Sequence, residues 1–517
     1  MATHETDVVV VGSGFGGSVA ALRLAEKGYR VAVLEAGRRF APEDFARTSW
    51  NLRRYLFAPR LGLRGIQRLT LLDDLLVLSG AGVGGGSLVY ANTLYEPLDP
   101  FYDDPQWAGI ADWRAELRPY YAVAREMLGA VETPFESDAE RVVREVARRM
   151  GAEDTFRRAV VAVDFERCTR CGGCMVGCRY GAKNTLDRNY LRLAELGGAA
   201  VHPEREARLV RRAAGGWEVE TVRSGAWLRR RPELFRAEQV VLAAGALGTT
   251  RLLFRSGLGG PGTGSLVRSN SEAIVGASAR DGRVDYSEGI AIGSSFRPRP
   301  DTQIEPVRYP RGSSLMGLLS TILVDGGGRV PRPLRWLATA ARHPITFVRS
   351  HRVRGWAERV VILLVMQARD NSLRVRWTGR RLRSEPGHGE PSPSWVPEAN
   401  EAARHAAAVM GGLPGSGLNE VFGRPFTAHL LGGAPIGASP GDGVVDAWQR
   451  VWSEPGLHVV DGAAVCANPG ANPSLTIAAQ AERALAFWPN RGEPDPRPPL
   501  GSRYAPVEPV PPQSLDG

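Results

Sequence analysis

A glycine-rich turn near the start of the chain has the spacing of a dinucleotide-binding loop. The β-branched run at residues 7–11 leads into Gly12, Gly14 and Gly17, and a helix-like segment follows. Gly12 makes the tight turn, Gly14 lets the backbone approach a pyrophosphate, and Gly17 lets helix and strand pack closely. The helix N-terminus attracts the anion, and Glu35, about 20 residues further along, is placed to bind a ribose. The pattern predicts a βαβ unit that binds a dinucleotide.

A second chemical signal is a run of cysteines at Cys168, Cys171, Cys174 and Cys178. This spacing is typical of a bacterial ferredoxin, although Arg179 stands where a proline would follow the last cysteine. A structural zinc site usually takes two cysteine pairs separated by a longer loop, so zinc fits less naturally. Thiols also persist without a metal in a reducing cytosol. An iron–sulfur cluster, zinc and a metal-free loop therefore all remain open.

Two further segments are unusual. Residues 80–87 contain too many glycines for a regular element and require either a ligand or positive φ angles. Near the other end of the chain, a short strand runs into Asp461, and Asn472 and Pro473 precede a helix-like segment at residues 477–483.

With these segments the chain resembles the glucose-methanol-choline (GMC) family of FAD oxidoreductases, and within it bacterial sterol oxidases of the mycobacterial type. The similar segments are residues 12–30, 34–37, 82–88, 241–245 and 429–433, and the resemblance extends in patches over about residues 5–490. It implies an α/β fold, with a Rossmann-type FAD-binding domain and an interleaved α+β substrate domain built on an antiparallel sheet.

The resemblance also implies roles for individual residues. The implied FAD contacts are Gly12, Gly14, Gly17, Glu35, Gly84, Gly85, Gly86, Ser87, Asn92, Asp461, Asn472 and Pro473. His429 matches the catalytic histidine, whose pKa suits proton transfer near neutral pH, and Asn472 matches the residue that faces the alcohol oxygen. Sterol oxidases also isomerise a double bond with a carboxylate base, for which Glu358 is the first candidate and Glu305 the second.

These positions predict domains that are discontinuous in sequence. The FAD-binding domain takes residues 1–95, 205–275 and 425–490, and the substrate domain takes residues 276–424. Residues 96–204 form a linker or cap with the cysteines, and residues 491–517 form a C-terminal arm. Within the substrate domain, the run 360–367, a polar turn and the alternating run 373–377 predict an antiparallel hairpin.

A basic and apolar segment lies before this hairpin. Apolar residues between 315 and 323 fall on one helical face, and aromatic and aliphatic residues alternate with arginines between 332 and 349. One interpretation is an insertion that packs on the core. The other is a lid that contacts a lipid surface and admits an apolar substrate.

Composition limits the remaining alternatives. The chain of 517 residues has a net charge of +10, spread along its length rather than in a stripe, which does not favour nucleic-acid binding. A spanning helix needs about 18 consecutive apolar residues, and the longest run is at residues 360–366. The N-terminus has no pattern of a secretory signal. We therefore expect a cytoplasmic protein, with peripheral membrane contact as an option.

Three functions are consistent with these features. The first is FAD-dependent oxidation of a 3β-hydroxysterol to the ketone, with O2 as acceptor and with isomerisation as a further step. The second is a GMC dehydrogenase of another apolar alcohol that passes electrons through an iron–sulfur cluster to a partner. The third, a non-catalytic flavin electron carrier, is disfavoured because His429 and Asn472 are both present.

Overall fold

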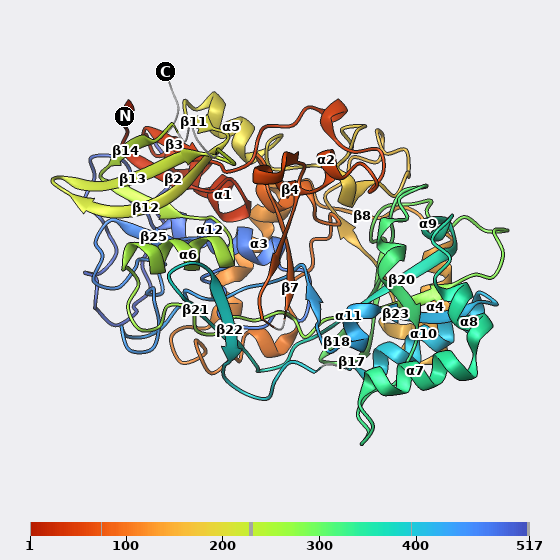
Figure 1. Ribbon diagram of the computed structural model, residues 1–517. Coiled ribbons are helices and arrows are strands. Elements are labelled where there is room, and N and C mark those ends of the chain that lie inside the picture. The colour runs from red at the N-terminus through yellow and green to blue at the C-terminus, as the bar shows by residue number, and fades with distance from the viewer. Residues whose placement is uncertain (1, 74, 227–230, 394, 514–517) are drawn as a thin grey trace.

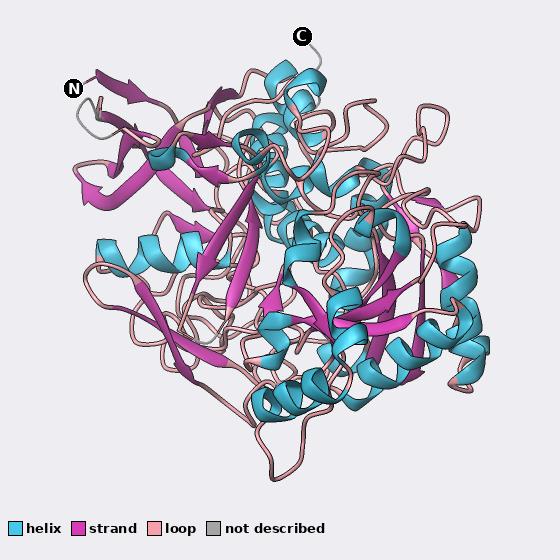
Figure 2. Ribbon diagram, turned by 45° about the vertical axis from the view of Figure 1, so that its right-hand side comes forward, coloured by secondary structure: helices cyan, strands magenta, loops and turns pink. Residues whose placement is uncertain are grey.

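The computed structural model describes residues 2–73, 75–226, 231–393 and 395–513. A parallel sheet and an antiparallel sheet lie on opposite sides of the molecule, at the left and right of Figure 1, and strand β7 (Leu76–Gly80) runs between them. Figure 2 shows that helices pack around the antiparallel sheet. No helix of the described residues is long and apolar enough to cross a membrane.

The parallel sheet consists of short, buried runs of β-branched residues. Its central strand β2 (Val8–Val11) is buried at every position, as expected for a strand covered on both faces. The order is β11-β3-β2-β15-β25, with β11 (Ala200–His202), β3 (Val31–Leu34), β15 (Gln239–Leu242) and β25 (Leu457–Val459). Helix α1 (Phe15–Glu26) joins β2 to β3. The predicted βαβ unit is confirmed.

A smaller sheet continues from the end of β3. The backbone N–H of Arg205 donates to the carbonyl of Glu35 at 2.8 Å, and β12 begins there. The order is β1-β14-β13-β12, with β1 (Ala2–Glu5), β14 (Glu233–Ala237), β13 (Gly216–Arg223) and β12 (Arg205–Ala213). Helix α6 (Ala246–Ser256) packs on β12, where Val210 N–H donates to Ser256 Oγ at 3.0 Å.

The antiparallel sheet has the order β19-β23-β16-β20-β18-β17-β9. Its strands are β19 (Ser320–Ile322), β23 (Leu413–Gly417), β16 (Ala273–Ser278), β20 (Val360–Gln367), β18 (Thr302–Val307), β17 (Ser294–Arg299) and β9 (Arg157–Arg158). Side chains alternate between its faces. Val361 and Leu363 belong to a core with helices α4 (Asp138–Arg149) and α10 (Pro397–Val409), whereas Ile362 and Leu364 line a cavity.

The predicted hairpin of β20 with residues 373–377 is wrong. Strand β20 pairs with β16 and β18, and β21 (Leu373–Trp377) pairs with β22 (Leu382–Pro386). Between them the chain is held by Arg268, whose guanidinium donates to the carbonyl of Asn371 at 3.1 Å. Alternation identified both strands but could not identify their partners, because pairing here is set by contacts distant in sequence.

The helix expected over residues 315–323 is also wrong. A short 3-10 helix at Leu315–Leu319 gives way to strand β19, since backbone pairing with β23 replaces helical hydrogen bonds. The basic segment that follows does form helices, α7 (Arg332–Arg342) and α8 (Pro344–Ser350), and then α9 (Trp356–Arg359).

Elements of residues 96–204 are divided between the two sides. Helices α3 (Trp113–Met127) and α5 (Tyr190–Leu196) contact α12 (Ser474–Ala486) and α1, respectively, beside the parallel sheet. Helix α4 and strand β9 belong to the antiparallel sheet. The described part of the C-terminal arm packs beside the parallel sheet, where Lys27 Nζ at the end of α1 donates to the carbonyl of Val510 at 2.6 Å.

Candidate active site

The first glycine loop has the close contacts that the pattern predicted. Gly12 has φ +106°, and a Cβ there would overlap the carbonyl of Ala243, while a Cβ at Gly17 would overlap the carbonyl of Gly12. A Cβ at Gly14 would meet nothing within 4 Å, and this residue lines the cavity. The N-terminus of α1 therefore faces open space into which a diphosphate fits.

Glu35 lies beside this loop. Its side chain is 6% exposed, lines the cavity, and accepts hydrogen bonds from Ser13 Oγ at 2.7 Å and Gly37 N–H at 2.7 Å. These donors fix the carboxylate at the end of β3, where a ribose would lie.

The second glycine loop contributes only in part. Gly85 and Gly86 line the cavity, whereas Gly84 and Ser87 do not, and Ser87 Oγ instead donates to the carbonyl of Gly84 at 2.7 Å. Asn92 is fully buried at φ 72° and does not line the cavity, although the residues on each side of it do. Ser87 is therefore placed to support the loop rather than to contact a ligand.

The C-terminal segment closes the same cavity. Asp461, Asn472 and Pro473 all line it. Asp461 accepts from Thr249 Oγ1 at 2.6 Å and from Gly245 N–H at 2.7 Å. Burial raises the pKa of Asp461 to about 6, although these hydrogen bonds lower it. The predicted FAD segments thus surround one cavity of about 1480 Å³, larger than the usual range of about 300–1,000 Å³ for one ligand.

His429 follows strand β24 (Phe426–Thr427) and lines this cavity. Its Nδ1 lies 2.8 Å from Glu272 Oε1, and its Nε2 lies 3.1 Å from the side-chain amide of Asn472. Burial lowers the pKa of His429, but the charge and hydrogen bond of Glu272 outweigh this and raise the pKa above its usual value.

The amide of Asn472 connects His429 to a second carboxyl group. When its carbonyl accepts from His429 Nε2 at 3.1 Å, its NH2 donates to Glu305 Oε1 at 2.8 Å, and both amide atoms are satisfied. Glu305 is fully buried and also accepts from Gln303 Nε2 at 2.6 Å. Burial raises the pKa of Glu305 to about 8.

Glu358, the first candidate for the isomerising base, is elsewhere. It lies in helix α9, outside the cavity lining, and accepts from the backbone N–H of Gly312 at 3.2 Å. Glu305, the second candidate, is the one that reaches Asn472.

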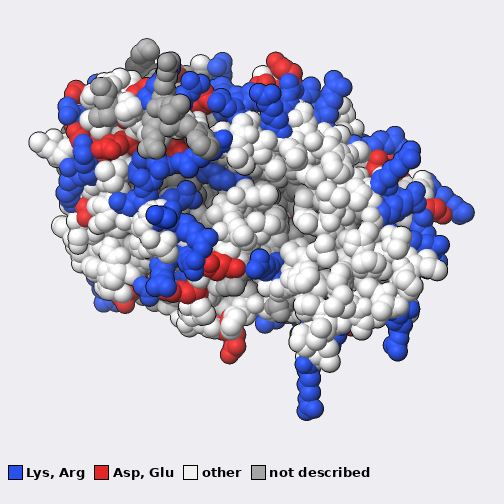
Figure 3. Space-filling model, viewed as in Figure 1, with Lys and Arg blue, Asp and Glu red and all other residues white. Residues whose placement is uncertain are grey.

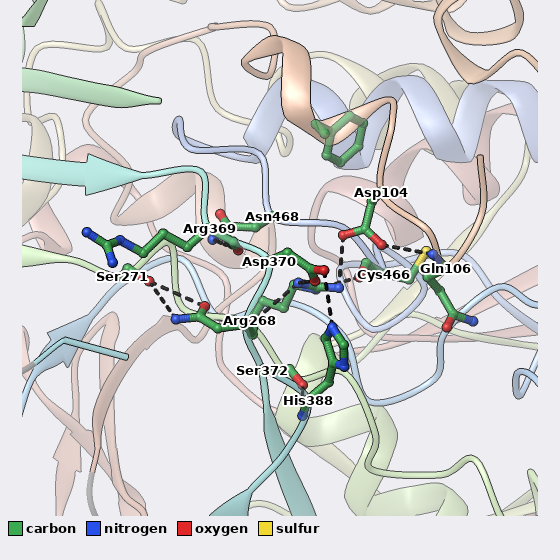
Figure 4. A network of polar contacts seen from close by, with 12 residues as sticks. Asp104, Gln106, Arg268, Ser271, Arg369, Asp370, Ser372, His388, Cys466 and Asn468 are labelled. Carbon is green, nitrogen blue, oxygen red and sulfur yellow. Dashed lines mark hydrogen bonds and ion pairs between the residues drawn. The ribbon is translucent and has the colours of Figure 1, made fainter. Parts of the chain in front are cut away.

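Sequence reasoning missed Glu272 and Arg268. Glu272 directly precedes β16, and no motif marks it. Arg268 is fully buried and binds Asp104 at 2.9 Å, Asp370 at 3.1 Å and the carbonyl of Cys466 at 2.7 Å, as Figure 4 shows. Its backbone also pairs with Leu431, so it joins the segment of His429 to the loop that leads to Asn472. These segments are distant in sequence, so their proximity is seen only in the folded structure.

The four clustered cysteines are close enough for their charges to affect Cys168, but they do not form the predicted metal site in the described residues. Cys171 is exposed and the others are partly exposed, and burial raises the pKa of the Cys168 thiol to about 11. Throughout the described ranges, no group of three or more His, Cys, Asp or Glu side chains is placed to hold a metal ion. The geometry therefore does not supply the ligand set that the sequence suggested.

A dinucleotide fold joined to a substrate sheet, with a histidine–asparagine pair where they meet, defines an FAD-dependent oxidoreductase. The chain belongs to the GMC oxidoreductase family, whose models match residues 6–276 and 379–481.

Known proteins extend this comparison. The chain is 51% identical to a cholesterol oxidase of Mycobacterium tuberculosis, over 98% of this chain and 96% of that one. It is 39% identical to a cholesterol oxidase of Acinetobacter baumannii, over 94% and 95%. The solved structure of a pyridoxine 4-oxidase from Mesorbium loti has the same fold, with a TM-score of 0.61 at 16% identity, over 93% of this chain and 98% of that one.

Proposed function

We propose that this protein oxidises the 3β-hydroxyl of a sterol to the ketone, with O2 as the final acceptor. The observation that carries the proposal is the pair His429 and Asn472 at an apolar cavity beside the FAD segments. The cholesterol oxidases that are 51% and 39% identical over nearly the whole chain support it. Bound FAD supplies the acceptor for the hydride that leaves the alcohol carbon.

His429 takes the hydroxyl proton on Nε2 in this scheme. Glu272 holds Nδ1, so the ring presents Nε2 to the cavity and the positive charge that develops on the ring is balanced. The amide of Asn472 can turn between donating to and accepting from Nε2, which lets it hydrogen bond before and after the proton moves.

The cavity lining suits an apolar, rigid substrate. Side chains from β16, β20 and the segment before β19 contribute a continuous apolar wall, including Ile274, Met316, Leu319, Ile362 and Leu364. Such walls bind by burying apolar surface, and a few polar groups fix the orientation. Here those polar groups are His429 and Asn472.

Glu305 is the base that we propose for isomerisation, in place of Glu358. A carboxylate whose pKa is about 8 binds a proton more strongly than an exposed carboxylate does. The reason is that burial destabilises its ionised form relative to its protonated form. Glu305 does not itself line the cavity, but its hydrogen bond with Asn472 connects it to a residue that does.

Helices α7 and α8 are the surface that we propose meets a membrane. Leu334, Leu337, Ile345 and Val348 are more than half exposed, and Figure 3 shows the lower right of this face as mostly uncharged, with basic residues at its edge. Arg349 of α8 also lines the cavity. Apolar side chains with arginines beside them favour an anionic lipid surface, from which a sterol can be taken.

The dehydrogenase alternative has no specific support here. It depends on a cluster at the cysteines, whose side chains are not placed to hold a metal ion in the described residues.

The proposal is tested by measuring the turnover of a 3β-hydroxysterol under air, with hydrogen peroxide formation as the readout. We expect His429→Gln to lose about 100-fold or more of this turnover, typical of a positioned acid–base group, with FAD content unchanged. Sterol turnover that persists in His429→Gln, or that requires an artificial acceptor in place of O2, would contradict it.

A further inference from the structure

Four arginines from three elements line the cavity, and two of these elements, α6 and β12, pack against each other. Arg208 lies on β12, Arg251 and Arg255 lie one turn apart on the same face of α6, and Arg68 lies on β6 (Gln67–Leu71). All four are partly exposed, and we refer to them as the arginine cluster. Figure 3 shows basic side chains gathered over the left half of this face, where β12 and α6 lie in Figure 1.

The charge of this cluster is mostly unbalanced. Glu206 is the acidic residue that lines the cavity here, and it accepts from Arg208 at 2.6 Å. Within residues 2–73, 75–226, 231–393 and 395–513, the side chains of Arg68, Arg251 and Arg255 form no ion pair. Such an excess of positive charge on one part of the cavity wall attracts anions.

The arginines also affect one another. Burial lowers the pKa of Arg251, and the charges of Arg68, Arg208 and Arg255 lower it further, although the charge of Glu206 raises it. Burial and Arg208 likewise lower the pKa of Arg255. Like charges that face each other in a partly dry cavity oppose folding, and a bound anion would remove that cost.

The cluster is separate from the place expected for the FAD diphosphate. That diphosphate fits at the N-terminus of α1, next to Ser13, which donates to the carboxylate of Glu35. The backbone carbonyl of Glu35 accepts from the backbone N–H of Arg205, at the start of β12. Arg208 follows three residues later, about 10 Å along this strand. The ribose position therefore separates the diphosphate from the cluster.

We propose that the arginine cluster is a second anion site, which binds a phosphate-bearing ligand beside the adenosine end of FAD. A guanidinium group presents parallel N–H donors that match two oxygens of a phosphate. Three elements that are distant in sequence supply these groups, so one ligand can receive hydrogen bonds from several directions. The site does not depend on the proposed sterol oxidation.

Calorimetric titration of the FAD-loaded protein with pyrophosphate tests the proposal. We expect binding that weakens as salt increases, and we expect Arg251→Gln to raise the Kd about tenfold or more, because it removes a charged hydrogen bond. Arg255→Gln is a second variant, in case the first fails to fold. Arg192→Gln is the matched control, since Arg192 is exposed on α5 outside the cavity, and its Kd should stay unchanged.

A second titration identifies the source of the phosphate. If vesicles of phosphatidylglycerol bind through Arg251 and Arg255, and pyrophosphate displaces them, the ligand is a lipid headgroup. If only pyrophosphate binds in this way, the ligand is a free phosphate ester. If the FAD-loaded protein binds neither, or if both variants bind as the wild type does, the proposal is wrong. Loss of FAD from both variants, with no pyrophosphate binding by the holoenzyme, would overturn it too, because the cluster would then serve the cofactor.

Discussion

Glu272 and His429 form a buried pair, with Glu272 Oε1 2.8 Å from Nδ1 of the ring. The side chain of Glu272 is 1% exposed, and the same oxygen accepts from Thr427 Oγ1 at 2.7 Å. The carboxylate thus fixes the ring and directs Nε2 towards Asn472. A carboxylate in this position both orients a histidine and stabilises its charged form.

Glu272→Gln should lower turnover and change its pH dependence. The charge of Glu272 raises the pKa of His429, whereas burial lowers it. Removing the charge leaves burial dominant, so the pKa falls and the neutral base persists to lower pH. We expect the acidic limb of kcat/KM to move to lower pH and kcat to fall about 10- to 100-fold, as measured by pH–rate profiles.

Thr427→Val is the matched control for that change. It removes the hydroxyl that donates to Glu272 and accepts from the backbone N–H of His429, but it keeps the charge of Glu272, so the acidic limb should stay in place. An unmoved limb in Glu272→Gln would show that the carboxylate does not set the pKa of His429.

Glu305→Gln should abolish isomerisation while oxidation persists. The base must be ionised, so the rate of conjugated enone formation should rise as the pH approaches about 8. The same raised pKa costs stability: the wild type loses unfolding free energy as pH rises from the unfolded value towards about 8, because the folded state then binds more protons than the unfolded state. Glu305→Gln should lack this loss.

Glu358→Gln provides the comparison for isomerisation. Glu358 accepts from the backbone N–H of Gly312 and has no contact with His429 or Asn472 among the described residues, so this variant should form the conjugated product at the wild-type rate. Loss of isomerisation in Glu358→Gln, with Glu305→Gln unaffected, would reverse the assignment.

Arg268→Met should destabilise the protein strongly. Its side chain is 1% exposed and pairs with Asp104, which is 6% exposed. Removing one partner of a buried pair leaves the other charge uncompensated and costs about 3–5 kcal/mol of unfolding free energy. Arg283→Met is the control, because its side chain is 87% exposed and surface changes cost about 0.5 kcal/mol or less. Urea unfolding should separate the two, and equal losses would refute a structural role for Arg268.

The βαβ unit could be predicted because its physics is local. The turn, helix and second strand lie within about 30 residues, and the close contacts of Gly12 and Gly17 follow from the spacing alone. Glu35 could be placed for the same reason. The chemical groups at residues 429 and 472 became interpretable only through the family resemblance.

The remaining features depend on contacts between distant segments. Glu272 reaches His429 across more than 150 positions, and β20 pairs with strands on both sides instead of with its neighbour in sequence. Glu358 ranks above Glu305 on the sequence alone, and this order could not be checked there, because the sequence does not show which carboxyl group faces Asn472. The cysteine spacing matched a ligand motif, yet in the described residues the thiols are not placed to hold a metal ion.

Cys171→Ser should leave sterol oxidation under air unchanged. Cys171 is exposed, and no metal-binding group of side chains is formed by the described part of the chain. Iron and acid-labile sulfide, assayed in anaerobically purified protein, should fall well below one cluster per chain. Stoichiometric iron that Cys171→Ser removes would restore the dehydrogenase alternative.

Replacing Ile345 and Val348 together by glutamate should weaken binding to anionic vesicles. Both side chains are about two-thirds or more exposed on α8, at 67% and 70%, so the substitutions should not disturb the core. Each removes apolar contact with the lipid and adds a charge that the anionic surface repels. Turnover of sterol held in vesicles should fall, whereas turnover of detergent-dispersed sterol should not.

Leu196→Glu is the control, because Leu196 is 68% exposed on α5, beside the parallel sheet. If the double variant and Leu196→Glu reduce vesicle binding equally, α8 is not the membrane-contacting surface.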